Sequence, residues 1–267
     1  VLFRSIIMTK GIRYKKNYLT GVIFRINFSN ILQLSGKNKE AAEKFQKEVF
    51  DKFPNVHFQF NNNINVQVDI QEGKSESKLE DGDLTWIFTD EQNTKQVELN
   101  SKSLILAYRK GAYEGFEEFL DDVSLILSAL RWYMPFNLTF LGLRYINQIH
   151  EDVIDDSNIH EYVNESLLNN VIFELEDNEG FSQLFTRLDL LKDDYQLTFQ
   201  YGFFNPEYPK VSTKKDFILD YDCKLTKIDS VNSQFEIEEE LKKMNKIIYD
   251  KFKYSTTNKL KELMEVI

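Results

Sequence analysis

The chain has 267 residues, of which 42% are apolar and 14% aromatic, with only 10 glycines and 4 prolines. This composition is typical of a packed globular protein and excludes a chain that is disordered over most of its length. The net charge of −10 repels phosphate polyanions, so binding to nucleic acid would require a local basic patch.

A single cysteine, Cys223, excludes an internal disulfide and a thiolate metal cluster, and its apolar neighbours indicate an inert core thiol. Neither an apolar run of membrane-spanning length nor a signal-peptide pattern occurs. We therefore expect a cytoplasmic protein with no membrane partner. Residues 1–8 are predicted to be an extension ending at a native start, Met8, because the segment before Met8 has no counterpart in the repeat described below.

The first half of the chain, residues 9–135, predicts the order β-α-β-β-β-β-α. Alternating apolar and polar residues over 19–28 predict the first strand, and helical spacing over 39–53 predicts a helix that Pro54 ends. A second, longer helix is predicted over 113–132. Between the helices, turn-rich pieces such as 72–82 separate four predicted strands: 56–70, 84–89, 95–99 and 103–109.

The second half, residues 136–267, repeats this order. It begins with a predicted strand over 138–149 and a short helix over 158–168, and it ends with a long helix over 235–254 that a piece at 257–267 extends. The strands predicted between these helices are 171–175, 181–191, 195–204 and 215–228.

Short matches between the halves support an internal duplication, for example Phe24-Arg25 with Leu143-Arg144. Two such pseudo-repeats predict an α+β fold with one long curved antiparallel sheet and two long helices packed on one face. The TATA-binding-protein-like and helix-grip architectures have this element order. Tandem ferredoxin-like domains are the alternative.

Common catalytic signatures are missing from the sequence. The three histidines, His57, His150 and His160, form no metal-ligand motif, and no phosphate-binding glycine loop or nucleophile elbow occurs. We therefore predict no cofactor and no metal site. Asp220 and Asp222 point to the same side of a predicted strand, where paired carboxylates could act in acid-base chemistry or hold a divalent cation.

Strand alternation places a set of polar residues on the sheet face opposite the long helices. Ile23, Phe140, Ile146 and Phe185 share that face, and such a mixture suits a partner peptide, a nucleic-acid strand or a small anionic ligand. The competing interpretation is a set of cross-strand salt bridges. The candidate binding residues are Arg25, Asn27, Arg109, Arg144, Arg187, Asp220 and Asp222, with Arg25 and Arg144 expected near a pseudo-twofold axis.

One basic cluster, Lys10, Arg13, Lys15 and Lys16, lies near the N-terminal end. Such runs occur in nucleic-acid-binding arms and, more often, in solvated termini. We favour the solvated terminus, so a nucleic-acid partner stays open only through a local patch.

Several strand and helix segments resemble a sporadically distributed family of bacterial proteins of similar length and no assigned function. They include residues 16–19, 85–88 and 142–147, together with Tyr113, Phe116 and Phe119. The resemblance covers the chain from about Gly11 onward and implies a mobile-element or phage-defence setting. It supplies no catalytic residues.

The leading hypothesis is a non-enzymatic binding or regulatory protein that receives a protein partner on the polar sheet face. One alternative is a metal-dependent enzyme acting on nucleic acid or a small anionic substrate through Arg144, Arg187 and the Asp220/Asp222 pair. Another is a structural subunit of a larger complex.

Overall fold

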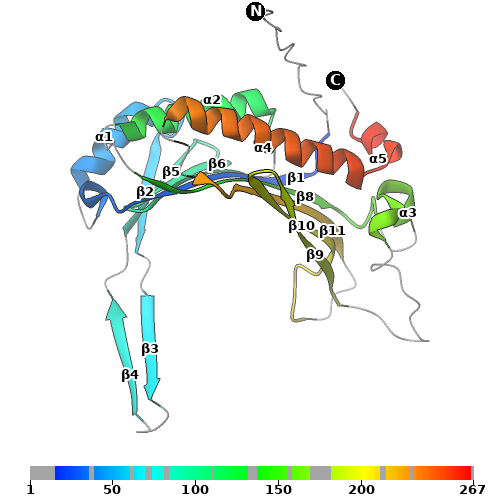
Figure 1. The fold of residues 1–267 in the computed structure, drawn as a ribbon, viewed down its shortest axis with the longest axis horizontal. Coiled ribbons are helices and arrows are strands. Elements are labelled where there is room, and N and C mark those ends of the chain that lie inside the picture. Colours follow the sequence, from blue (N-terminus) through cyan, green and yellow to red (C-terminus); the bar gives the residue numbers. More distant parts are fainter. Residues whose placement is uncertain are drawn as a thin grey trace, which may run out of the picture.

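The fold is a curved antiparallel sheet with its long helices on one side (Figure 1). The computed structural model describes residues 16–35, 39–60, 63–69, 74–80, 84–109, 111–131, 137–154, 158–168, 182–210, 215–228, 231 and 233–265. The predicted α+β class with a long curved sheet is confirmed.

The main sheet has nine strands in the order β2-β5-β6-β7-β1-β8-β11-β10-β9, and every neighbouring pair is antiparallel. Tandem ferredoxin-like domains would form two separate sheets of interleaved strands, whereas the described strands form one sheet in which β5, β6 and β7 pair in chain order, so that alternative is wrong. The strands are β1 (Leu19–Phe28), β2 (Asn55–Phe60), β5 (Leu84–Thr89), β6 (Lys95–Leu99), β7 (Ser103–Arg109), β8 (Leu138–Ile149), β9 (Leu184–Lys192), β10 (Tyr195–Phe204) and β11 (Asp216–Leu225).

A separate two-stranded hairpin, β3 (Asn63–Asp69) and β4 (Lys74–Glu80), projects from the main sheet (Figure 1). The predictions of a single strand over 56–70 and of a turn-rich piece over 72–82 are therefore wrong. The sequence Lys74–Glu80 is mostly charged and polar, and such residues are depleted in strands that pack on a core. This composition concealed β4.

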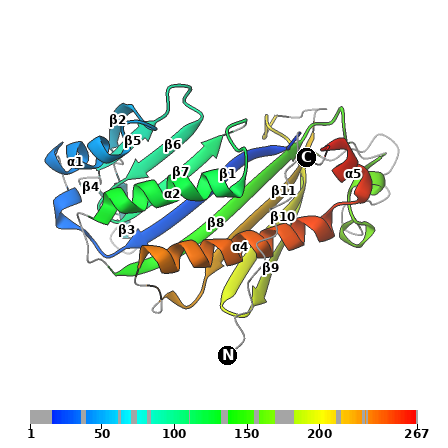
Figure 2. The same cartoon turned by 90° about the horizontal axis from the view of Figure 1, so that it is seen from above.

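The helices α1 (Lys39–Val49), α2 (Phe116–Leu130) and α4 (Gln234–Ser255) lie on the convex side of the sheet, where α2 and α4 run side by side (Figures 1 and 2). The short helices α3 (Ile159–Tyr162) and α5 (Asn258–Leu263) lie together near one end. The described residues also include the 3-10 turns η1 (Leu32–Leu34) and η3 (Glu165–Leu167). None of the described helices is both long and apolar enough to cross a membrane.

Strands β1 and β8 form the centre of the sheet and join its two halves. Their register places Phe24 opposite Leu143, Arg25 opposite Gly142 and Ile23 opposite Arg144. Within the main sheet, the described strands of the first half lie on the β1 side and those of the second half on the β8 side. The duplication itself stays a prediction. The predicted extension at 1–8 and the strand predicted at 171–175 lie outside the described residues.

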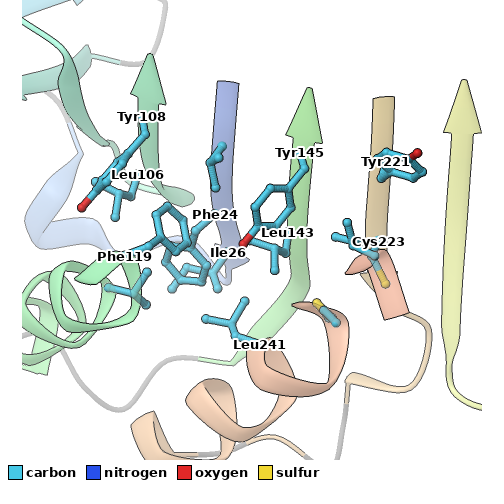
Figure 3. Close-up of a cluster of buried hydrophobic side chains, with 14 of the residues drawn as sticks. Phe24, Ile26, Leu106, Tyr108, Phe119, Leu143, Tyr145, Tyr221, Cys223 and Leu241 are labelled. Carbon is cyan, nitrogen blue, oxygen red and sulfur yellow. The ribbon is translucent and has the colours of Figure 1, made fainter. Parts of the chain in front are cut away.

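The core lies between the sheet and the convex-side helices (Figure 3). Phe24 and Ile26 of β1 pack with Leu143 of β8, Phe119 of α2 and Leu241 of α4, all of them fully buried. Period-2 alternation puts one face of each central strand into this layer and leaves the other face to the concave side.

Cys223 also belongs to the core, as predicted. Its burial raises the pKa of the thiol to about 12, because a thiolate loses its hydration in apolar surroundings. Such a thiol stays protonated and is a poor nucleophile.

One buried carboxylate, Asp122 of α2, connects four elements on the helix side. It is fully buried and accepts hydrogen bonds from the Tyr108 hydroxyl of β7, from Lys52 after α1 and from Lys95 of β6, the last at 3.2 Å. Lys95 also donates to Glu118 at 2.6 Å. Because a buried charge is tolerated only when it is paired and hydrogen-bonded, this network is structural.

Replacing Asp122 with alanine should lower the free energy of unfolding by about 3–5 kcal/mol, because Lys95 and the Tyr108 hydroxyl lose their buried acceptor. Urea denaturation followed by circular dichroism measures the change. The neighbouring Asp121 is exposed, so Asp121→Ala is the matched control and should shift the free energy of unfolding by no more than about 0.5 kcal/mol. Equal effects of the two variants would show that the Asp122 network contributes no stability.

Candidate functional site on the concave sheet face

The concave face consists of the strand side chains that point away from α1, α2 and α4. None of the described helices covers it (Figure 1). Cross-strand registers arrange these residues in rows, one of which runs from Arg109 of β7 through Asp220 of β11 to Arg187 of β9. The next row contains Arg144 and Asp222 directly opposite each other. The predicted residues thus share one face.

Arg144 binds Asp220 rather than the directly opposite Asp222. Its Nε and Nη2 atoms donate to the two carboxylate oxygens of Asp220 at 2.8 and 2.6 Å. This is the bidentate geometry that makes a guanidinium-carboxylate pair strong. The Asp220 side chain is only 8% exposed, so Arg144→Ala would leave a buried carboxylate unpaired and cost about 1–3 kcal/mol of stability. Both Asp220 oxygens are already engaged by Arg144.

Asp222 is half-buried and makes no hydrogen bond or ion pair in the described part of the chain. Burial raises the pKa of its carboxyl group above the ordinary value, and the nearby positive charges of Arg144, Lys224 and Arg187 only partly offset that effect. A carboxylate that is partly desolvated and left without a direct partner carries a free-energy cost in the folded state. Such costs concentrate at functional sites.

Arg25 lies on β1, the central strand next to β8, and its side chain is exposed. Its guanidinium sits 5.7 Å from the centroid of the Phe140 ring, and its Nε donates to Asn27 at 2.8 Å. The ring has room because Gly142, opposite Arg25, carries no side chain: a Cβ atom there would lie 2.8 Å from the ring. Arg25 thus stacks on an aromatic ring, and among the described residues only Asn27 accepts a hydrogen bond from its guanidinium.

Two other predicted arginines are held by neighbours on the same face. Arg109 donates to Gln96 at 2.7 Å. Arg187 donates to both oxygens of Asp189 at 3.2 Å, and the Thr198 hydroxyl donates to the same carboxylate at 2.6 Å. The competing interpretation of cross-strand salt bridges therefore describes Arg144, which reaches Asp220 on the neighbouring strand. Arg187 pairs along its own strand instead, and Arg25 forms a hydrogen bond to Asn27.

Charges of the two signs balance on the described strands of this face, five of each, although the whole chain carries −10. Lys224 was missed in the sequence analysis. It follows Asp220 and Asp222 at the same two-residue spacing, so the strand alternation that placed those two on this face also predicts Lys224 there. The charged residues are Arg25, Arg109, Arg144, Arg187 and Lys224, with Glu98, Asp189, Asp216, Asp220 and Asp222.

Other candidates from the sequence are not brought to this face. Within the described ranges, no group of three or more His, Cys, Asp or Glu side chains is arranged to hold a metal ion. Of the basic N-terminal cluster, Lys16 forms an ion pair with Glu265 at 2.6 Å. Lys10, Arg13 and Lys15 lie outside the described residues.

Comparison of the chain with protein-family models and with curated proteins finds no match.

Replacing Asp222 with asparagine should make the free chain more stable at pH 7. Because the folded-state pKa is raised, protonated Asp222 contributes stability below the ordinary value of 3.8, and that contribution is lost as the pH rises through the folded-state pKa. The advantage of Asp222→Asn should therefore be full at neutral pH and shrink in acid. Urea denaturation at a series of pH values measures it, with Asp121→Asn as the exposed control. A variant less stable than the native chain at pH 7 would contradict the assignment.

Proposed function

We propose that the chain is a non-enzymatic binding protein whose concave sheet face receives an extended segment of a protein partner. A basic side chain of that segment pairs with Asp222, and an acidic side chain meets Arg25 or Lys224. The mobile-element or phage-defence setting implied by the family resemblance remains a prediction.

The charge pattern of the face favours a peptide over a polynucleotide. A nucleic-acid strand presents a continuous row of negative phosphates, and proteins that bind it line the path with lysine and arginine. Here Asp220 and Asp222 of β11 and Asp189 of the edge strand β9 interrupt that path. A segment carrying charges of both signs could match the pattern, because electrostatic complementarity requires opposite charges to meet along the contact.

Apolar side chains supply the remaining contact surface. Phe185 of β9 is exposed and packs against Phe204 of β10 with ring centroids 6.0 Å apart. Ile23 and Ile146 lie half-buried near the centre of the face. Interfaces commonly combine an aromatic or arginine anchor with a surrounding polar rim, and the Arg25-Phe140 stack provides such an anchor.

The half-buried, unpartnered carboxylate of Asp222 is the observation that carries the proposal. An ammonium or guanidinium group of the partner could lie between Asp222 and the apolar side chains of the concave face. It would then offset the free-energy cost of desolvating the Asp222 carboxylate. The free chain would then give up some stability in return for affinity and specificity, as binding sites commonly do. No comparable observation supports catalysis.

The test is to select linear peptides from a display library on the immobilised full chain and to measure their affinities by fluorescence anisotropy. Selected peptides should contain lysine or arginine, and Asp222→Asn should weaken their binding by about tenfold or more, because it removes one member of a desolvated charge pair. Arg25→Ala should weaken the binding of those selected peptides that also carry an acidic residue.

Asp121→Asn is the matched control, because it removes a carboxylate on the helix side of the sheet. It should leave the peptide affinities unchanged. Equal affinities for the native chain and Asp222→Asn would overturn the proposal, as would selection of peptides without basic residues. Tight binding of a single-stranded oligonucleotide at physiological salt, weakened by Arg25→Ala, would assign the face to nucleic acid instead.

A further inference from the structure

The edge strand β2 exposes a row of large apolar side chains on the helix side of the sheet. Val56 is 40% exposed, Phe58 54% and Phe60 44%. Phe58 packs edge-on against Trp86 of β5, with ring centroids 5.7 Å apart, so this row extends the core outward without a break. Within the described sheet β2 pairs only with β5.

Strand β2 lacks the features that usually protect an edge. Exposed edge strands generally carry charged residues, a proline or a bulge that prevents another strand from pairing. Asn55–Phe60 contains no charged residue and no proline, and its pairing with β5 is regular over six residues. At the opposite edge of the described sheet, β9 carries Arg187, Asp189 and Lys192. Only β2 is therefore suited to pairing with a further strand.

The charge around β2 permits a second copy of the same chain to approach. Two chains of net charge −10 repel each other over most of their surfaces. The described segment 39–60, which forms α1 and β2, has no net charge. Its charged residues are four lysines (Lys39, Lys44, Lys47 and Lys52) and four acids (Glu40, Glu43, Glu48 and Asp51).

We propose that two copies of this chain pair through β2, antiparallel to each other, and join their sheets into one. A two-fold axis normal to the sheet at Phe58 would place Phe58 against its own copy and Val56 against Phe60 of the other copy. Every apolar side chain of the row then meets another apolar side chain. In a register shifted by one residue, His57 of one copy would lie on the same face as the apolar row of the other copy. The side-chain pattern therefore specifies the register.

Such a dimer is independent of the function proposed for the concave face. The two-fold axis keeps both concave faces on the same side of the joined sheet. Asp222 lies on β11, which five strands separate from β2. Failure of the peptide-binding test therefore leaves this inference standing, and failure of the dimer leaves the peptide-binding proposal standing.

Sedimentation velocity of the full chain over a wide concentration range tests the inference. The native chain should form dimers, and Phe58→Lys should weaken dimerisation at least about tenfold, because two like charges would then face each other across the axis. Leu188→Lys is the matched control. Leu188 is 37% exposed, lies on the same face of the other edge strand and should leave the dimer unchanged.

Hydrogen exchange on the native chain tests the same contact without a substitution. Amides of Asn55–Phe60 should become more protected as the protein concentration rises, whereas those of β9 should not change. A chain that stays monomeric at all concentrations would overturn the inference. So would a dimer whose β2 amides gain no protection, or one that Phe58→Lys and Leu188→Lys weaken equally.

Discussion

Pairing between β1 and β8 is the interaction on which the rest of the structure depends. It joins the two halves into one sheet, and its register decides which side chains enter the core and which face the concave side. With Phe24 opposite Leu143, both point toward the helices, and the flanking Arg25 and Arg144 point away. Since strand side chains alternate, a slip of one residue would turn one strand over, burying Arg25 and exposing Phe24, or burying Arg144 and exposing Leu143.

Where one strand face is buried by helices, the sequence alone was sufficient to predict the structure. Alternation over 19–28 and 138–149 identified both central strands, and the apolar stripe of α2 identified its packed face. Those patterns exist because burial of apolar surface selects residues position by position. Hairpin β3–β4 stands apart from the main sheet, so this selection does not shape its sequence, and β4 was missed.

Partner choice among polar residues could not be predicted, because it depends on distances that alternation does not encode. Both Asp220 and Asp222 were placed on the correct face, but only the folded structure shows that Arg144 reaches the diagonal Asp220. Asp122 was overlooked, although a carboxylate within an otherwise apolar helical stripe was a readable signal. The sequence thus limits which residues can meet, and three-dimensional packing selects among them.

Asp122 and Asp222 show how one sheet treats a desolvated carboxylate on its two faces. On the helix side Asp122 is fully enclosed and receives three donors, so its charge is satisfied within the chain. On the concave side Asp222 has neighbouring positive charges but no direct donor among the described residues. A purely structural acid at that position would gain from a partner such as the one Asp220 has in Arg144. The lack of a donor for Asp222 among the described residues is explained if another molecule supplies that donor.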